Sequence, residues 1–387
     1  MRIIHVEDRF EPLAGYQINE LIKEQVELNY DITIITSDLP IFSDKSKLGE
    51  LDKEFQKNYP VRIIRLKPLF ILSQRYYFHK LFRLLDSLQP DLVFLHGIVD
   101  FKDLILLKSS RKYIIVRDCH MSWVASKNKF SKILPTFYSL FFSKIVNTTT
   151  KYKKIYSLGI EETQYLQKLK INESKIEDLY HGYNSKDMFY SKEYRKKLRK
   201  KYAVKETEVF IGYIGKFDSA KQPDLIFDIL NKIDKKYLEK IKVLFVGNLF
   251  GEYGSKFLKK AEKSILKENI FYENAQPYEN LYKYYSALDI CVWPKETTLS
   301  SIHAQVCNTI PIMEDHLSNR ERVIENKYLY EIDNLEDAGK KIEQAIDNLE
   351  TINFESMTRK IHDRDYTYRV KILSSEWESM LNEKKNN

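Results

Sequence analysis

The chain has 387 residues, of which 43% are hydrophobic and 30% are charged, and its formal net charge is +8. This hydrophobic content excludes a disordered chain, and the length exceeds what one core of ordinary size covers, so we expect two domains. Met1 leads directly into an apolar run, and no uncharged apolar stretch is long enough to cross a bilayer, so neither a signal peptide nor a transmembrane helix is expected.

Short apolar runs alternate with segments of helical spacing through the first half of the chain. Strands are expected at residues 2–6, 31–36, 61–66, 91–95, 112–116, 144–148 and 175–180. Helices are expected at residues 18–30, 76–88 and 162–169, where apolar side chains recur at helical intervals. Such alternation is typical of βαβ units, in which a parallel sheet carries helices on both faces.

A second alternation of the same kind begins near residue 208. Its strands are expected at residues 209–214, 242–246, 271–272 and 289–293, with one more from residue 310. The basic run YRKKLRKKY at 194–202 predicts a helix with a solvated face, and residues 359–381 are helical in pattern. Two α/β halves predict a two-lobed enzyme with a cleft between the lobes.

The stretch WPKETTLSSIHAQVCNTIPIMEDH at 293–316 combines a strand end, a polar loop and a helix that starts near Ser300. A helix start has unpaired N–H groups and partial positive charge, which suits an anion such as a diphosphate. Glu296 and His303 flank it as candidate partners of a sugar or a ribose. Ordinary capping of the helix stays open as an alternative, because the loop is rich in hydroxyl groups at Thr297, Thr298, Ser300 and Ser301.

Six segments, in their order and spacing, resemble the motifs of retaining glycosyltransferases of family 4, which use nucleotide-activated sugars. These segments are PLAGYQINELIKEQVELNYDITIITSD, PDLVFLHG, LYHGYNSKDMF, IGYIGKFDSAKQPDLIFDIL, AQPYENLYKYYSALDICVWP and HAQVCNTIPI. The resemblance covers nearly the whole chain and implies the GT-B fold, with two Rossmann-like, doubly wound parallel-sheet domains and a glycogen synthase-like C-terminal lobe. It implies an acceptor-side domain at 1–195, a nucleotide-sugar domain at 196–358, and a C-terminal helix at 359–387 that returns to the first domain.

The resemblance assigns the donor diphosphate to two lysines of the second half. Lys216 and Lys221 follow the expected strand at 209–214, where they would neutralise charge that develops on the leaving group. Two solvated lysines are the alternative. The remaining donor-binding residues implied by the resemblance are Glu296, Thr298, Leu299, Ser300, Ser301 and His303.

The first half supplies the acceptor side of the implied site. Gly15 in the first βα loop lets the backbone approach a ligand closely, and Tyr16 and Gln17 beside it are candidate acceptor contacts. His120 occupies a position similar to the family histidine that faces the transferred sugar, and Asp118 is expected to orient it. A plain loop glycine and a structural histidine are the alternatives, and His96 competes with His120 for the role.

The chain departs from the family pattern at several positions. The family carries two glutamates eight positions apart, whereas this chain has Lys295, followed by Glu296, at the first position and His303 at the second. A neutral imidazole accepts one hydrogen bond and cannot act as a bidentate acceptor. Lys216 stands in place of an arginine and therefore lacks the planar fork, and Asn308 stands in place of a glycine.

The function implied is a hexosyltransferase-type reaction that moves a sugar from a nucleotide diphosphate to a glycan or lipid-linked acceptor, in surface polysaccharide or glycoconjugate synthesis. We expect no metal and no cofactor. A catalytically silent GT-B subunit that binds a sugar nucleotide or a partner enzyme is the alternative, which the broken glutamate pair motivates. Nucleic-acid binding is disfavoured because no recognition motif accompanies the positive charge.

The location expected for the protein is the cytoplasm, with a peripheral contact to anionic membrane surfaces as a further expectation. Three cysteines without CxxC spacing, Cys119, Cys291 and Cys307, favour buried thiols in a reducing compartment. The segments 129–154 and 194–202 mix basic with aromatic or apolar residues, as membrane-binding surfaces do. A basic soluble surface accounts for them equally well.

Overall fold

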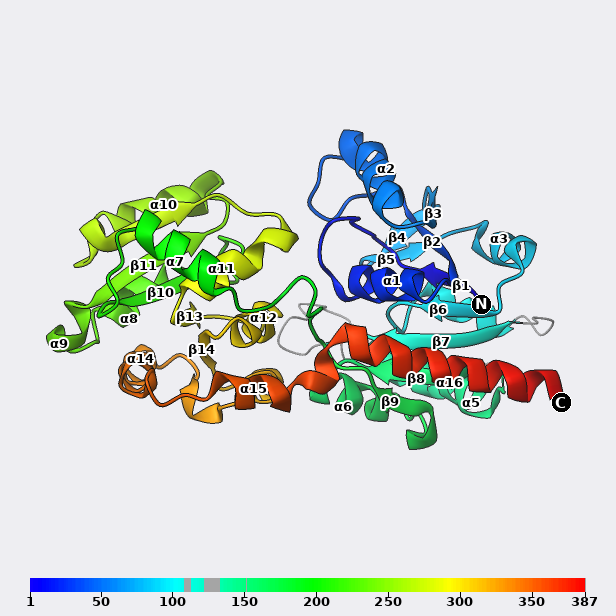
Figure 1. Ribbon diagram of the computed structural model, residues 1–387. Coiled ribbons are helices and arrows are strands. Elements are labelled where there is room, and N and C mark those ends of the chain that lie inside the picture. The colour runs from blue at the N-terminus through cyan, green and yellow to red at the C-terminus, as the bar shows by residue number, and fades with distance from the viewer. Residues whose placement is uncertain (108–112, 122–132, 151, 387) are drawn as a thin grey trace. The chain divides into compact units, whose positions relative to one another are not determined.

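The computed structural model describes residues 1–107, 113–121, 133–150 and 152–386, which are drawn in colour in Figure 1. It divides into two compact units, of which unit 1 holds Met1–His181 and the segment from Tyr366 onward, and unit 2 holds Gly182–Asp365. The sequence places the division at residue 195 instead. Residues 182–195 pack with unit 2, where the Tyr183 N–H donates to the Arg364 carbonyl (3.1 Å) and the Ser191 N–H donates to the Ser286 hydroxyl (2.9 Å).

Unit 1 is built on a parallel seven-stranded sheet in the order β3-β2-β1-β6-β7-β8-β9. The strands are β1 (Arg2–Val6), β2 (Asp31–Ser37), β3 (Val61–Leu66), β6 (Leu92–Leu95), β7 (Ile114–Cys119), β8 (Tyr152–Ser157) and β9 (Ile176–Asp178). Its helical segments are α1 (Gln17–Glu27), α2 (Leu48–Asn58), α3 (Leu81–Leu88), η2 (Phe101–Leu107), α4 (Ile133–Phe141), α5 (Ser143–Thr148) and α6 (Ile160–Lys168). Consecutive side chains of β6 are buried, because a parallel sheet is covered on both faces.

Two predictions for this unit were wrong. Residues 144–148 form part of helix α5 and not a strand, because Ser143 and Val146, three positions apart, turn toward the interior on one helical face. The strand that follows β7 in the chain is β8, where the partly exposed lysines at 153 and 154 interrupt the apolar run. Residues 76–88 do not form one helix, because a β-hairpin of β4 (Phe70–Leu72) and β5 (Arg75–Tyr77) precedes α3.

The C-terminal helix α16 (Tyr366–Asn386) packs against α1 in unit 1, as the sequence predicts. The side chain of Trp377 is fully buried, and its indole Nε1–H donates to the hydroxyl of Tyr156 on β8 (2.8 Å). It also packs edge-on against Phe94 of β6, with ring centroids 5.9 Å apart. Figure 1 shows this helix in red. It begins at Tyr366, after α15 (Phe354–Lys360), which belongs to unit 2.

Unit 2 is built on a parallel six-stranded sheet in the order β12-β11-β10-β13-β14-β15. The strands are β10 (Val209–Ile214), β11 (Ile241–Val246), β12 (Ile270–Glu273), β13 (Ile290–Trp293), β14 (Ile310–Glu314) and β15 (Leu329–Tyr330). The helices are α7 (Lys192–Lys201), α8 (Leu225–Leu230), α9 (Lys235–Leu238), α10 (Gly251–Ala261), α11 (Leu281–Ala287), α12 (Ser300–Val306), α13 (Leu317–Arg320), α14 (Leu335–Asn348) and α15. Two doubly wound parallel α/β units are therefore confirmed.

The three cysteines are free and buried, as predicted. Among the described residues, we find no helix that combines the length and the apolar character needed to cross a membrane.

Candidate active site

The carboxyl ends of β1, β6 and β7 meet at one edge of the unit 1 sheet, because the three strands are parallel neighbours. Open α/β sheets place ligands at this edge. His96 follows β6 and His120 follows β7, so the fold brings together the two histidines that the sequence leaves in competition.

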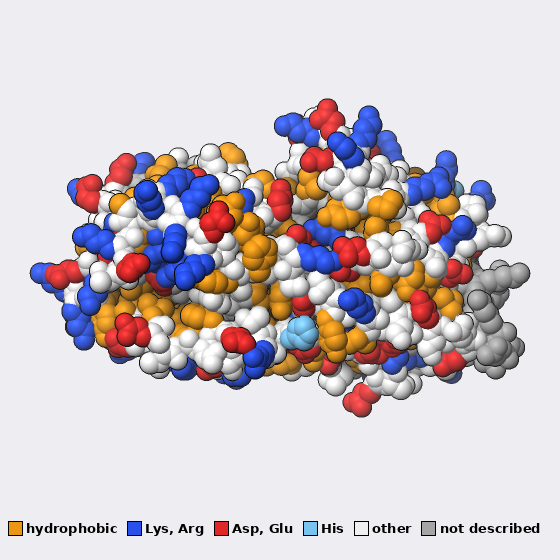
Figure 2. Space-filling view, viewed as in Figure 1, with side chains coloured by type: hydrophobic (Ala, Val, Ile, Leu, Met, Phe, Trp, Pro, Cys, Tyr) orange, Lys and Arg blue, Asp and Glu red, His pale blue; other side chains and the backbone are white. Residues whose placement is uncertain are grey.

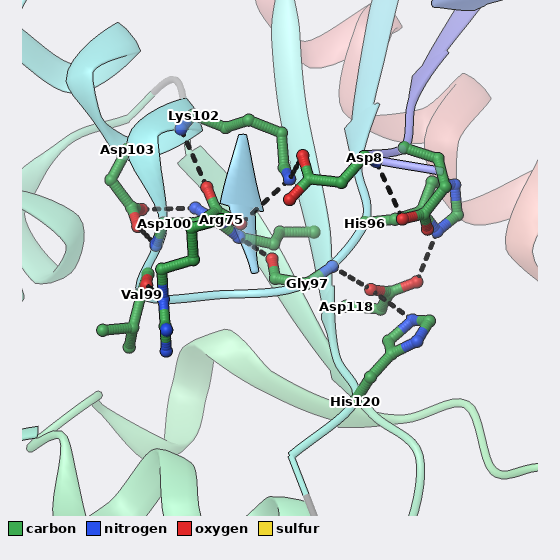
Figure 3. A network of polar contacts seen from close by, with 12 residues as sticks. Asp8, Arg75, His96, Gly97, Val99, Asp100, Lys102, Asp103, Asp118 and His120 are labelled. Carbon is green, nitrogen blue, oxygen red and sulfur yellow. Dashed lines mark hydrogen bonds and ion pairs between the residues drawn. The ribbon is translucent and has the colours of Figure 1, made fainter. Parts of the chain in front are cut away.

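Asp118 links the two histidines, and Figure 3 shows its carboxylate between them. Its Oδ1 lies 2.7 Å from Nε2 of His120 and accepts the backbone N–H of Gly97 at 2.8 Å. Its Oδ2 lies 2.7 Å from Nδ1 of His96. His96 and Asp118 are buried, whereas 39% of the His120 side chain is exposed, so only His120 faces a ligand.

The carboxylate of Asp118 keeps His120 charged. Burial alone would lower the pKa of His120, but the charge of Asp118 outweighs it and raises the pKa to about 9. Burial would likewise raise the pKa of Asp118, but His120 and His96 together hold it well below its ordinary value. At neutral pH, His120 is therefore an imidazolium that donates hydrogen bonds to a sugar hydroxyl or a phosphate oxygen.

A buried ionic cluster fixes the loop that follows β6 (Figure 3). The guanidinium of Arg117 pairs with Asp100 (2.8 Å) and also donates to the Gly97 carbonyl oxygen. The ammonium of Lys102 bridges Asp8 (2.7 Å) and Asp100 (3.0 Å). Buried charges are tolerated only when they are paired, and here the pairing holds Gly97, at φ +83°, against both Arg117 and Asp118.

The predicted acceptor loop precedes α1. Gly15 has φ +65°, a conformation that a glycine adopts without strain. The side chain of Asn19 holds the loop, because its Oδ1 accepts the Tyr16 N–H (3.2 Å) and its amide donates to the Glu11 carbonyl (3.0 Å). Gln17 is 4% exposed, and neither polar atom of its amide has a hydrogen-bond partner among the described residues.

Glu11 is a candidate ligand contact that the sequence analysis missed. It is 2% exposed, its Oε2 accepts the Ile41 N–H (2.9 Å), and its Oε1 has no hydrogen-bond partner among the described residues. It lines a pocket of about 330 Å³ whose apolar walls are Leu13, Phe42 and Leu51. Glu11 gives no local signal in sequence because a loop glutamate is ordinarily solvated.

In unit 2, Lys221 lies at the centre of a polar cluster beyond the end of β10. Its ammonium pairs with Glu296 (3.1 Å) and donates to the Thr297 carbonyl (2.8 Å). Burial lowers the pKa of Lys221 and the nearby charge of Lys216 adds to this, while Glu296 opposes it. The hydroxyl of Thr297 accepts from Arg322, a buried residue that the sequence analysis did not single out.

The hydroxyls at the start of α12 are mostly used within the turn. The Thr298 Oγ1 accepts the Ser300 N–H (3.2 Å), and the Ser301 hydroxyl donates to the Thr298 carbonyl (2.9 Å). Leu299 occupies the N-cap and supplies no side-chain hydrogen bond. Two of the hydroxyl groups therefore bond within the turn, but Leu299 stands at the N-cap, so no serine or threonine side chain caps α12 as the alternative interpretation expects.

His303 contacts Tyr278 and Gly182, which are not residues of the Lys221 cluster. Its ring is 5% exposed, packs 5.6 Å from the Tyr278 ring and hydrogen-bonds to the backbone of Gly182. Burial lowers its pKa to about 4, so the ring is neutral at physiological pH. Lys295, at the position of the first family glutamate, pairs with Glu314 and Asp333.

A larger pocket of about 540 Å³ lies at the opposite edge of the unit 2 sheet, where β10 and β11 begin. Its two arginines are already paired, since Arg199 binds Asp289 (2.8 Å) and Arg195 binds the same carboxylate. Ligands of open α/β sheets bind at the carboxyl ends of the strands, so we place the candidate site at the Lys221 edge.

His96, Asp118 and His120 bring ligand atoms within 4.8 Å of one another, a spacing that a metal ion could bridge. The hydrogen bonds of His96 and His120 to Asp118 account for the closeness of these three side chains without a metal. The Asp-x-Asp sequence at 363–365 gives no open pair of carboxylates either, because the Asp365 side chain is 3% exposed and accepts the Ser185 N–H (3.2 Å).

Comparison with known proteins confirms the resemblance. Residues 194–359 match the family described as glycosyl transferases group 1. The capsular polysaccharide biosynthesis glycosyltransferase CapH of Staphylococcus aureus is 26% identical over 235 residues, and the chain spans 59% of that relative's length, with 59% of this chain aligned.

Two solved structures show the same fold. Anabaena Alr3699/HepE in complex with UDP has a TM-score of 0.73 at 14% identity and covers 98% of this chain and 100% of its own. A glycosyltransferase from Rickettsia africae has a TM-score of 0.72 at 17% identity, covering 98% of each chain. HepE has also been solved with UDP-glucose.

Proposed function

We propose that this chain, whose residues 194–359 form a domain of the glycosyl transferases group 1 family, transfers a hexose from a nucleotide diphosphate to a glycan or lipid-linked acceptor. The observation that carries the proposal is the cluster of Lys221, Glu296, Thr297 and Arg322 within this domain, at the strand edge that binds ligands in open α/β sheets. The reaction proposed belongs to surface polysaccharide or glycoconjugate synthesis, which the similarity to CapH supports, and the cytoplasm is the location proposed for it.

The donor diphosphate is placed at the cationic side chains of unit 2. Breaking a glycosyl–phosphate bond puts negative charge on the leaving diphosphate, which positioned cations stabilise. Lys221 is half-buried and already oriented by Glu296 and Thr297, and Lys216 adds an exposed second charge. The complexes of HepE with UDP and UDP-glucose support a nucleotide-sugar donor of this class.

The reaction proposed retains the configuration of the transferred sugar. The acceptor hydroxyl attacks from the face that the diphosphate leaves, and the departing phosphate oxygen takes the hydroxyl proton. His120 donates a hydrogen bond from its charged ring to the transferred sugar, and Asp118 orients it. The chemistry assigned to these residues is positioning and charge stabilisation, so the proposal includes neither a metal nor another cofactor.

The acceptor is placed in unit 1 beside the loop of Gly15, Tyr16 and Gln17. The nearby pocket combines apolar walls with the unpartnered Oε1 of Glu11, a pairing that suits a hydroxyl on a partly apolar acceptor. The buried amide of Gln17 offers a further donor and acceptor.

The test is sugar transfer by the parent chain and by Lys221→Ala. We expect kcat/KM for the donor to fall by about a hundredfold or more, as when one group that stabilises a leaving oxygen is removed. Lys235→Ala is the matched control, because Lys235 is an exposed lysine of the same unit whose ammonium lies 4.0 Å from Glu239. A Lys221→Ala variant as fast as the parent would refute the donor assignment.

A catalytically silent subunit is the second candidate, and the engagement of His303 with Gly182 favours it. The family resemblance implies that a second glutamate accepts hydrogen bonds from the nucleotide ribose, whereas position 303 of this chain is a histidine. Incubation of the pure protein with a panel of sugar nucleotides separates the two functions. Binding without release of the diphosphate would support the silent subunit, and release of the diphosphate would support the transferase.

A peripheral contact with anionic membranes is proposed for unit 1. Helix α4 exposes Ile133 (65%), Phe137 (51%), Leu140 (67%) and Phe141 (59%), an apolar face suited to the interface of a bilayer. Residues 129–132 and 151 of the basic segment lie outside the described residues. We expect co-sedimentation with anionic liposomes at physiological salt and its loss in Phe137→Ser, whereas a parent chain that stays in the supernatant would contradict the proposal.

The basic helix α7 contributes less to a membrane contact than its sequence suggests. Figure 2 shows Lys and Arg side chains gathered over this part of unit 2. Arg195 and Arg199 are bound to Asp289, and Lys201 pairs with Glu273. The arginines therefore hold the helix to its own unit, and the remaining exposed lysines form a solvated face.

A further inference from the structure

The hydrogen bonds of His120 continue inward through unit 1. Beyond Asp118, Nε2 of His96 lies 2.9 Å from Nδ1 of His5 on β1, and Nε2 of His5 lies 2.8 Å from Oε1 of Gln25 on α1. The exposed fractions are 0% for His5, 1% for His96 and 0% for Gln25. Four elements thus supply an unbroken chain of five hydrogen-bonded side chains, His120–Asp118–His96–His5–Gln25, which we call the relay and which is buried except at His120.

The protons of the relay can be assigned from its two ends. Oε1 of Gln25 only accepts, so the His5 proton that meets it is on Nε2. Burial is the largest cause that lowers the pKa of His5, to about 3, so His5 carries one proton and its Nδ1 accepts from Nε2–H of His96. Asp118 is ionised and accepts at Oδ2, so Nδ1 of His96 also carries a proton.

We propose that His96 is a second, buried imidazolium, and that His96, His5 and Gln25 are positioning residues that act on His120 through Asp118. The Asp118 carboxylate then lies between two cations, and the cluster carries one net positive charge at the ligand edge of the sheet. That charge strengthens the hydrogen bond that His120 donates to the transferred sugar. This consequence for catalysis rests on the proposed function, whereas the proton assignment does not.

Other charged groups that face the relay favour the charged form of His120. Glu7, which follows β1, and Glu162 on α6 both raise the pKa of His120 after the larger effect of Asp118, and so favour its charged form. The nearby charges of Asp8 and Lys102 neutralise each other in an ion pair. The Phe94 ring stacks on His96 at 4.4 Å and shields it from water.

The glutamine at the inner end decides the proton order. With its amide turned round, Gln25 would donate to Nε2 of His5, His5 would donate from Nδ1 to His96, and His96 would carry one proton only. Gln25→Glu places an acceptor there in either orientation and keeps His96 doubly protonated. Gln25→Met has a similar length and offers neither donor nor acceptor, so it lets His5 reverse and His96 lose a proton.

The test is side-chain nitrogen NMR of the full chain with ¹⁵N-labelled histidine at pH 7, with signals assigned by single histidine substitutions. We expect His96 and His120 to show two protonated ring nitrogens each and His5 to show one, at Nε2. Gln25→Glu should preserve this pattern, and Gln25→Met should leave His96 with one ring proton. A parent chain in which His96 carries a single proton would overturn the proposal.

A kinetic arm examines whether the relay acts on the reaction. In Gln25→Met, loss of the His96 charge should move the alkaline limb of the kcat profile to higher pH and lower the plateau several-fold, with donor KM unchanged. A residue with a merely structural role would lower the active fraction at every pH without moving the limb, and that outcome would overturn the positioning role. Absence of transfer by the parent chain would refute the proposed function, while the NMR result would still decide the proton assignment.

Discussion

The charge of His120 depends on one carboxylate, and Asp118→Asn tests this directly. Asp118 and His120 are joined at 2.7 Å, and the pKa of His120 rises from its ordinary 6.5 to about 9. At pH 7.5 a pKa of about 9 leaves roughly 97% of the rings charged, whereas a pKa of 6.5 leaves roughly 9%. Since burial without the carboxylate lowers the pKa further, we expect at least about a tenfold loss of charged His120 in the variant.

The assay for this prediction is a pH titration of the His120 ring by NMR, with kcat measured over the same range. We expect the Asp118→Asn midpoint below pH 6.5 and a parallel loss of activity at pH 7.5. Glu7→Gln is the control, because Glu7 has a smaller effect on the same ring, and its midpoint should stay near that of the parent. An Asp118→Asn ring that still titrates near pH 9 would show that the charge has another source.

Three further predictions concern the acceptor pocket, the C-terminal helix and the pH dependence of stability. Glu11→Gln removes the unpartnered carboxylate oxygen, so acceptor KM should rise about tenfold while donor KM stays constant; equal changes in both would contradict the acceptor assignment. Trp377→Ala should destabilise unit 1 by about 3–5 kcal/mol in urea unfolding and leave the unit 2 transition in place; a shift of both transitions would argue against separate units. Because the folded pKa of His120 exceeds its unfolded value, its contribution is fully present below pH 6.5 and is lost as the pH rises to about 9. His120→Gln should therefore reduce the loss of unfolding free energy between pH 6.5 and about 9 by about 1–2 kcal/mol, a figure lowered for the 39% exposure of the side chain. A variant that loses as much unfolding free energy as the parent over this range would refute the assignment.

The strands were predictable wherever a short apolar run fills a buried position in a parallel sheet. Residues 2–6, 61–66 and 209–214 match β1, β3 and β10 residue for residue. The prediction failed at α5, where five residues are too few to distinguish helical from strand spacing. It also missed β8, since lysines at 153 and 154 interrupt the apolar run.

The candidate site was predictable where residues lie close in sequence, or where the family resemblance joins distant ones such as Lys221 and Glu296. Asp118 and His120 stand two positions apart at a strand end, and their contact is the one expected. The partners His5 and Gln25 could not be found, because 91 residues separate His5 from His96 and only the sheet order places β1 beside β6. Arg322 was missed for the same reason, as 25 residues separate it from Thr297.

The central claim is that unit 2 cleaves a nucleotide sugar at Lys221, and release of the nucleoside diphosphate measures this most directly. The pure chain would be incubated with a panel of labelled nucleotide sugars with and without glycan acceptors, beside Lys221→Ala and Lys235→Ala. We predict that the parent and Lys235→Ala release diphosphate from at least one donor and that Lys221→Ala does not. Donor binding without any release of diphosphate by the parent chain would contradict it.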